Sequence, residues 1–213
     1  MKDNIVITIG RQYGSGGRIV GKRLAEALGI SYYDKELLSV AAKESGLCED
    51  VFSRADEQTT NSLSYALSLG YSYMGMFTPY SDILSNEGLF KLQSDAIRNL
   101  SEKESCILVG RCADYILRDN PNLISFFIHN RCENRIKNII ETEQCSEEAA
   151  KERIAKNDKS RASYYNYFTN KTWGAAASYH FSLDLSLLGV EASVEFMKEL
   201  IERKQQLRPP HFG

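Results

Sequence analysis

Three glycines with the spacing of an anion-binding turn stand near the start of the chain. Gly14, Gly16 and Gly17 follow an apolar segment at 5–9 and precede an amphipathic segment at 18–28. Glycine permits positive φ angles and lets the backbone approach a ligand closely. Successive N–H groups in such a turn, at the start of a helix, can converge on an anion such as a nucleotide phosphate. The alternative is a glycine-rich turn without a ligand, but the first βα turn of an open sheet is where phosphates bind.

The turn matches the phosphate-binding pattern G-x-x-x-x-G-K-[ST] only in part. With Gly16 as the second glycine, Arg11 stands at the first glycine, Gly17 at the lysine and Arg18 at the hydroxyl position. A second register uses Lys22, but that residue lies a full turn inside the helix that follows. We therefore expect Arg18 or Arg11 to supply the positive charge that a lysine otherwise gives to the β- and γ-phosphates.

Further arginines stand where they could bind phosphate, since the planar guanidinium binds phosphate in a bidentate manner and stays charged. Arg111 follows an apolar strand at the expected carboxyl edge of a sheet, where ligands bind. Arg135 lies near the start of a helix, and its spacing from glutamates also fits an exposed, ion-paired face. Asp158 and Arg161, three residues apart on a helix, belong to the site or pair with each other on the surface.

The elements that position these residues alternate along the chain between strand-like and helix-like segments, which indicates a parallel sheet with helices on both faces. Apolar and β-branched patterns predict strands at 5–9, 31–33, 106–109, 123–128 and 179–185. Helical patterns occupy 18–28, 35–45, 90–103, 133–143, 146–167 and 190–204. Residues 46–89 break this rhythm and predict a partly helical insertion over the carboxyl edge of the sheet.

Length and composition predict one compact domain over residues 1–206 and a flexible tail at 207–213. The 213 residues carry a formal net charge of −2, so no overall basic character favours nucleic acid as a partner. Five cysteines without C-x-x-C spacing argue against a disulfide framework. No apolar run is long enough to span a membrane. We expect a cytoplasmic protein with no metal held by its own residues, and the sequence leaves its oligomeric state open.

These motifs together resemble cytidylate kinase. The resemblance is stronger to the bacterial cytidylate kinase-like proteins. It rests on the run Gly10-Arg11-Gln12-Tyr13-Gly14-Ser15-Gly16-Gly17, the run Val109-Gly110-Arg111-Cys112-Ala113-Asp114-Tyr115-Ile116-Leu117, and Asp158-x-x-Arg161. It implies a three-layer α/β/α P-loop NTPase fold with a five-stranded parallel sheet. It also implies that residues 46–89 are an acceptor-binding (NMP-binding) insertion and that residues 150–172 form a helical lid.

The resemblance also implies an activity: transfer of the γ-phosphoryl group of ATP, with Mg²⁺, to a nucleoside monophosphate, most simply CMP or dCMP. The residues expected to bind the donor phosphates are Arg11, Gly14, Ser15, Gly16, Gly17 and Arg18. The residues expected at the acceptor and lid are Asp34, Arg111, Arg135, Arg153, Asp158 and Arg161. Among all of these, Arg18, Arg111 and Arg161 are the expected catalytic residues, because phosphoryl transfer depends on positioning and charge neutralisation.

Two positions depart from the family pattern. Gly17 replaces the P-loop lysine, and Cys112 replaces the aspartate that follows the Gly-Arg pair in cytidylate kinases. Two alternatives therefore stay open: a nucleotide or phosphate sensor that has lost catalysis, and a kinase of a small non-nucleotide alcohol.

Overall fold

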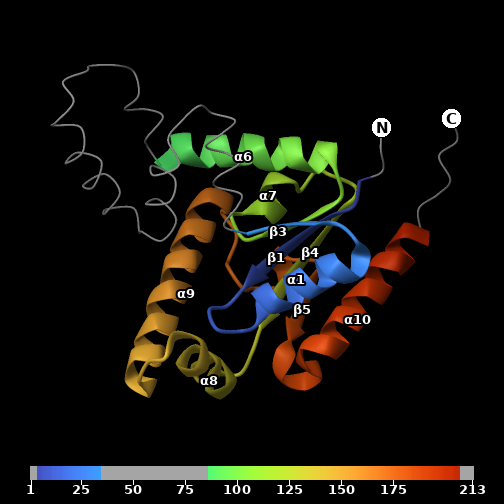
Figure 1. The fold of residues 1–213 in the computed structure, drawn as a ribbon. Helices are drawn as coiled ribbons and strands as arrows, with labels where there is room; N and C mark the ends of the chain where they lie inside the picture. Colours follow the sequence, from blue (N-terminus) through green and yellow to red (C-terminus); the bar gives the residue numbers. More distant parts are fainter. Residues whose placement is uncertain (1–3, 35–85, 207–213) are drawn as a thin grey trace, which may run out of the picture.

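Figure 1 shows the computed structural model of the chain, which describes residues 4–34 and 86–206. A sheet of five strands lies at its centre: β1 (Val6–Arg11), β2 (Ser31–Tyr33), β3 (Cys106–Val109), β4 (Leu123–His129) and β5 (Phe181–Asp184). The strand order is β2-β3-β1-β4-β5, and all four neighbouring pairs are parallel. The carboxyl ends of all five strands therefore share one edge of the sheet. The residues that follow each strand lie at this edge.

One face of the sheet is covered by α1 (Gly17–Leu28) and α10 (Leu185–Gln206), which also contact each other. Alternate residues of β1, among them Ile7 and Ile9, are fully buried against Val20 and Leu24 of α1 and Met197 of α10. The alternation follows from the two-residue period of a strand, which sends successive side chains to opposite faces.

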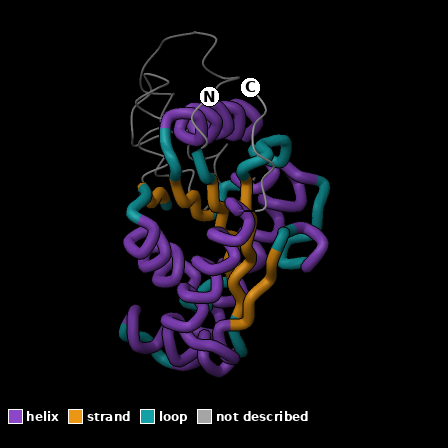
Figure 2. Tube along the Cα trace, turned by 90° about the vertical axis from the view of Figure 1, so that its right-hand side faces the viewer, coloured by secondary structure: helices purple, strands orange, loops and turns teal. Residues whose placement is uncertain are grey.

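The opposite face is covered by α6 (Asn86–Lys103), α7 (Ala113–Ile116) and the C-terminal part of α9 (Glu147–Thr169). Val6 and Leu108 lie in this second core with Ile97 of α6 and Tyr165 of α9. With helices on both faces, the molecule has three layers, and Figure 2 shows the sheet between them from the side.

Two helices lie beside the carboxyl edge of the sheet, as Figure 1 shows. These are α8 (Cys132–Glu143) and the N-terminal part of α9, which pack on each other through Ile139, Ala150 and Ile154. Tyr13, from the segment after β1, packs against this small core. The helix pair is thus attached to the glycine-rich turn.

The predicted α/β architecture and its five parallel strands are confirmed, with shifts at element ends. The fifth strand begins at Phe181 instead of residue 179, because a short 3-10 turn, η1 (Ala176–Ser178), precedes it. The last helix begins at Leu185 rather than residue 190, with a break at Gly189 where φ is 71°. The short helix α7 was not predicted.

Of the predicted insertion at 46–89, the structure describes only residues 86–89, which form the first turn of α6. Residues 46–85 of this insertion, the predicted helix at 35–45 and the predicted tail at 207–213 lie outside the described residues. The expected lid at 150–172 consists mainly of α9, which continues to Thr169.

Candidate phosphate-binding site

The donor loop, as we name residues 12–18, joins β1 to α1. Gly14 has φ 74° and Gly16 has φ 91°, values that side chains on L-residues rarely adopt. A Cβ at Gly14 would also lie 2.9 Å from the carbonyl oxygen of Arg135. Both the conformation and the crowding therefore require glycine at these positions.

The donor loop has backbone N–H groups to offer a ligand. Within the described residues, no hydrogen bond uses the N–H of Gly14, Gly16 or Arg18. The N–H of Gly17 reaches the Ser15 hydroxyl at 3.3 Å. These amides stand at the N-terminus of the twelve-residue helix α1, where the helix dipole favours an anion.

Arg11, the last residue of β1, fills the space in which a lysine at position 17 would lie. A Cβ built on Gly17 comes within 2.7 Å of Arg11 Cβ, closer than two such carbons can approach. A Cβ on Gly110 would likewise overlap the Arg11 guanidinium. Arg11 Nη2 contacts Asp34 Oδ1 at 3.1 Å, and its buried Nε has no hydrogen-bond partner among the described residues. A cation is therefore present beside the donor loop despite the missing lysine.

Asp34, directly after β2, joins two of the expected residues. Its Oδ1 contacts Arg11, and its Oδ2 lies 2.6 Å from Arg18 Nε. The Arg18 side chain is 47% exposed, so its guanidinium remains accessible to a ligand. Arg18 is thus a partly exposed arginine that pairs with Asp34 beside the donor loop.

Four arginines lie close enough to interact with one another near this carboxylate: Arg11, Arg18, Arg111 and Arg161. Burial, and next the charge of Arg161, lower the pKa of Arg11 to about 9. Burial also lowers the pKa of Arg111 and of Arg161. The cations are thus poorly solvated and mutually repelling, a state that a bound anion relieves.

Arg111 is carried by a strained turn between β3 and α7. Gly110, Arg111 and Cys112 have φ of 77°, 58° and 55°, and two of the three carry side chains. Such left-handed residues cost energy and cluster at functional sites. At this position Arg111 interacts electrostatically with Tyr164, Asp34 and Arg18.

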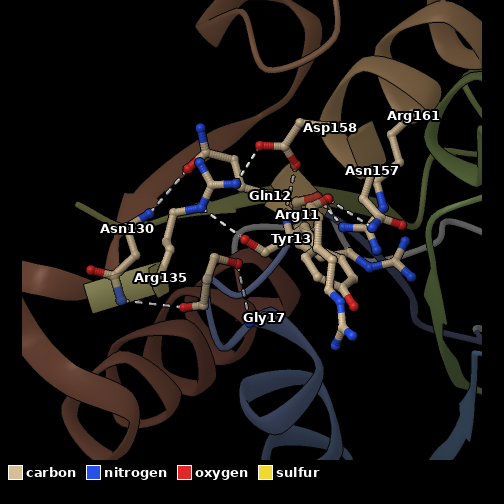
Figure 3. A network of polar contacts seen from close by, with 11 residues as sticks. Arg11, Gln12, Tyr13, Gly17, Asn130, Arg135, Asn157, Asp158 and Arg161 are labelled. Carbon is tan, nitrogen blue, oxygen red and sulfur yellow. Dashed lines mark hydrogen bonds and ion pairs between the residues drawn. The ribbon is translucent and has the colours of Figure 1, made fainter. Parts of the chain in front are cut away.

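Arg135 and Asp158 form an ion pair on the donor loop itself (Figure 3). Arg135 is 6% exposed, so the alternative of an exposed, ion-paired helix face is wrong. Its Nε donates to the Tyr13 carbonyl at 2.8 Å, while the other Asp158 oxygen accepts the Tyr13 N–H at 2.8 Å. The partner that the structure gives Asp158 is therefore Arg135, from α8, rather than Arg161 three residues along α9.

Arg161, one of the residues expected at the acceptor and lid, lies against the donor loop. Its Nη1 donates to the Arg11 carbonyl at 3.1 Å, and its guanidinium lies over the Tyr13 ring, 5.2 Å from the centroid. The physical reason is the packing of α9 on α8 and the donor loop, which turns this face of the helix toward β1.

Arg153 lies farther from the arginine cluster. It pairs with Glu143 at the end of α8, and Glu143 also accepts the Tyr13 hydroxyl. The Arg153 side chain is 45% exposed. Among the described contacts it reaches the donor loop through Glu143.

Sequence reasoning missed the asparagines that hold the donor loop from outside. Asn138 Nδ2 donates to the Gly14 carbonyl at 2.9 Å, and Asn130 Nδ2 to the Ser15 carbonyl at 3.4 Å. Asn130 follows β4 at the carboxyl edge, a signal that could have drawn attention to it. Asn138, two turns into α8, gave no such signal.

The donor set does not fit a directly bound Mg²⁺. The position of the P-loop hydroxyl holds Arg18, a cation that cannot ligate a metal. The nearest carboxylate, Asp34, already contacts two arginines. In the part of the chain that the structure describes, no group of three or more His, Cys, Asp or Glu side chains could hold a metal ion. No described helix is long and apolar enough to cross a membrane.

Comparison with known proteins gives one family. The profile described as "Cytidylate kinase-like family" matches residues 6–187. A crystal structure from Eubacterium ventriosum, described as an uncharacterized protein, is 30% identical with a TM-score of 0.70, covering 93% of this chain and 99% of that chain. Comparison with curated proteins gives no match.

Two shikimate kinases share the fold at low identity. The structure from Bacteroides thetaiotaomicron has a TM-score of 0.52 at 14% identity, covering 93% of this chain and 98% of its own. The structure from Acinetobacter baumannii, in complex with shikimate, has a TM-score of 0.51 at 12% identity and covers 96% of each chain. These two likenesses concern the P-loop kinase fold alone.

Proposed function

Because the chain belongs to the cytidylate kinase-like family, we propose that it is an ATP-dependent phosphotransferase acting on a nucleoside monophosphate, most simply CMP or dCMP. Membership of a kinase-like family and the P-loop kinase fold support a phosphotransferase of some kind. The nucleotide acceptor is the finer part of the proposal.

One observation carries the proposal: the exchange of residue types between positions 11 and 17. Arg11 occupies the space of a side chain at position 17, and its guanidinium lies beside the donor loop. The N–H groups of Gly14, Gly16 and Arg18 are available for phosphate oxygens. A loop without its lysine thus keeps both a backbone cradle and a cation, which are the two parts that phosphate binding requires.

The roles follow from the chemistry of phosphoryl transfer, in which positioning and charge neutralisation supply most of the rate. The donor loop holds the β- and γ-phosphates of ATP. Arg11 and Arg18 neutralise charge on the transferred group. Arg111 and Arg161 face it from β3 and α9 and meet the acceptor phosphate, while Asp34 fixes the guanidinium groups before the ligand arrives.

The acceptor side of the proposal involves two segments. Residues 46–89 are proposed to bind the nucleoside monophosphate, and 150–172 to exclude water from the transferring group. ATP fits the donor loop as described above. Mg²⁺, which kinases of this kind generally use with ATP, finds no direct ligand among the described residues of the site, so no step is assigned to it.

A nucleotide or phosphate sensor without catalysis is the first rival. It is suggested by Gly17 and Arg18, which replace the lysine and the hydroxyl residue of the P-loop pattern. A kinase of a non-nucleotide alcohol is the second rival. Both share the donor loop with the main proposal and differ in what happens after ATP binds.

A coupled assay of ADP release, run with ATP against a panel of nucleoside monophosphates and small alcohols, tests the proposal. We expect turnover with CMP or dCMP. Turnover with an alcohol alone would replace the nucleotide acceptor, and ATP binding without turnover on any acceptor would leave the sensor. Arg23→Ala, which removes an exposed arginine of α1 paired with Glu191, is the matched control and should leave turnover unchanged.

A further inference from the structure

The backbone of Tyr13 is bound at both of its polar groups by one ion pair. Asp158 Oδ1 accepts the Tyr13 N–H, and Arg135 Nε donates to the Tyr13 carbonyl, while Arg135 Nη2 and Asp158 Oδ2 pair with each other (Figure 3). The Arg135 side chain is 8% exposed and that of Asp158 is 19% exposed. The three residues form a closed ring of contacts between the donor loop, α8 and α9.

The peptide geometry turns this ring into a constraint on the ligand side of the donor loop. A trans peptide directs its C=O and the next residue's N–H in opposite directions. With the Tyr13 carbonyl held toward Arg135, the N–H of Gly14 faces away from α8. With the Ser15 carbonyl held by Asn130, the N–H of Gly16 also faces away from the side chain that holds it. These two N–H groups are among those without a partner in the described residues.

We propose that the Arg135–Asp158 ion pair is a positioning device for the donor loop, fixing the peptide plane between Tyr13 and Gly14 so that the N–H group of Gly14 points at the donor phosphates, as Asn130 does for the N–H of Gly16. The proposal rests on the proposed function and gives these two residues a different task from the acceptor and lid roles expected of them. They act through the backbone of Tyr13 and need not touch the nucleotide.

The charges of the pair explain why these residue types are present. An ionised carboxylate accepts two hydrogen bonds more strongly than a neutral amide, and a guanidinium can donate in two directions at once from a rigid plane. A backbone segment with positive φ at Gly14 has no regular hydrogen-bond ladder of its own. Two opposed charges on adjacent helices supply the missing partners and cancel each other where solvent is scarce.

The test uses tripolyphosphate as the probe, which presents the donor phosphates without a base or an acceptor. Three variants of the full chain are compared with the wild type by calorimetry and by hydrogen exchange of the 12–18 amides without ligand. Asp158→Asn keeps the shape and removes the charge. The pair Arg135→Met with Asp158→Leu removes both charges, a replacement that often leaves stability intact. Glu147→Gln, which breaks the exposed Glu147–Lys151 pair of α9, is the matched control.

We expect both ring variants to bind tripolyphosphate about 10-fold or more weakly, because small misplacements of positioning groups are costly. Their loop amides should exchange faster while the amides of α8 and α9 do not, and in turnover the KM for ATP should rise with the acceptor KM unchanged. Glu147→Gln should change binding by less than about twofold, as exposed pairs contribute little.

A folded double variant with wild-type affinity for tripolyphosphate and wild-type loop exchange would overturn the proposal. The positioning role of the ion pair and the proposed function can be disproved independently. If the wild type itself binds no tripolyphosphate, the proposed function is wrong, and the exchange of the loop amides still decides whether the ion pair fixes the loop.

Discussion

Arg11 and Gly17 show at the scale of single residues how a phosphate site can be rearranged without being lost. The P-loop pattern asks for glycine at the first position and lysine after the last glycine, and this chain has an arginine and a glycine there. Because a Cβ at 17 would lie 2.7 Å from Arg11 Cβ, the two side chains exclude each other. The exchange is therefore physically coupled, and the two substitutions cannot be judged singly.

This coupling predicts a reciprocal rescue. Arg11→Gly removes the cation and should lower kcat by about 10²-fold or more, the scale of removing one preorganised charge donor. Gly17→Lys alone collides with Arg11 and should be as inactive. The double variant, which restores the P-loop pattern, should recover at least about 10-fold over either single variant, since only a correctly placed charge can restore transition-state stabilisation. The coupled assay measures all three, and wild-type turnover in Arg11→Gly would contradict the coupling.

The sequence could predict which residue types gather at this edge, but not their pairings. Arg11, Arg18 and Arg111 follow or begin elements whose ends meet in a parallel sheet, so their convergence could be predicted. The pairing of Asp34 with two arginines depends on how the end of β2 lies beside β1 and α1, and the position of Arg161 over Tyr13 depends on how α9 packs against α8. That packing involves contacts between residues far apart in the chain, which local patterns do not encode.

At the scale of elements, α7 shows how the arginine turn is held in place. This four-residue helix carries Asp114, whose Oδ2 accepts the Tyr165 hydroxyl of α9 at 2.7 Å. Cys112 at its start is buried with Tyr165 and Tyr179 in the second core. The turn that carries Arg111 is thus held to α9 by a largely buried carboxylate.

This carboxylate predicts a pH dependence of stability. Burial raises the pKa of Asp114 above its ordinary value. The folded state then binds a proton more readily than the unfolded chain, so stability falls as pH rises through the window above the unfolded pKa. Asp114→Asn removes this loss and should raise the free energy of unfolding at pH 7 on the order of 1 kcal/mol, with little gain below the unfolded pKa.

Urea unfolding at acid and neutral pH measures this difference. Asp119→Asn, on an exposed carboxylate that pairs with Arg118 at 3.7 Å, is the control and should leave the pH profile unchanged. If Asp114→Asn instead lowered the free energy of unfolding equally at both pH values, the buried charge of Asp114 would not be what destabilises the wild type at neutral pH.

Element boundaries show where sequence patterns suffice. Most elements were predictable because the central strands β1, β3 and β4 are buried and read as apolar runs, and because α1, α6 and α8 each have an apolar stripe. The start of α10 was missed because Gly189 interrupts its pattern, and α7 was missed because four residues are too few to show a helical period. The long α9 was foreseen, but its attachment to the donor loop was not.

At the scale of the whole molecule, the carboxyl edge of the sheet carries a local excess of positive charge in a chain whose net charge is −2. Among the described residues, Arg11, Arg18, Arg111 and Arg161 interact with one another near Asp34, which pairs directly with Arg11 and Arg18. Repulsion among these arginines is a cost in the folded protein that a bound polyanion would lower.

A polyphosphate should accordingly stabilise the fold. At about 100 times its Kd, tripolyphosphate adds about 2.7 kcal/mol to the free energy of unfolding. For a chain of this length that corresponds to a rise in Tm of about 5–10 °C. Differential scanning calorimetry should show the rise in about 50 mM salt and a smaller one in about 500 mM, because salt screens the charges. An unchanged Tm at both salt concentrations would contradict the electrostatic account.

The measurement that tests the central claim most directly is a calorimetric titration of ATP into the wild type and Gly16→Val. Gly16 has φ 91°, and a Cβ there would lie 3.0 Å from Leu185, so valine both strains the loop and closes its N–H cradle. Gly29→Val is the matched control, because Gly29 also has positive φ, 65°, but nothing lies within 4 Å of its Cβ position. We expect ATP to bind the wild type and Gly29→Val, and we expect a folded Gly16→Val not to bind ATP. Wild-type ATP affinity in Gly16→Val would contradict the assignment of residues 12–18 as the donor loop.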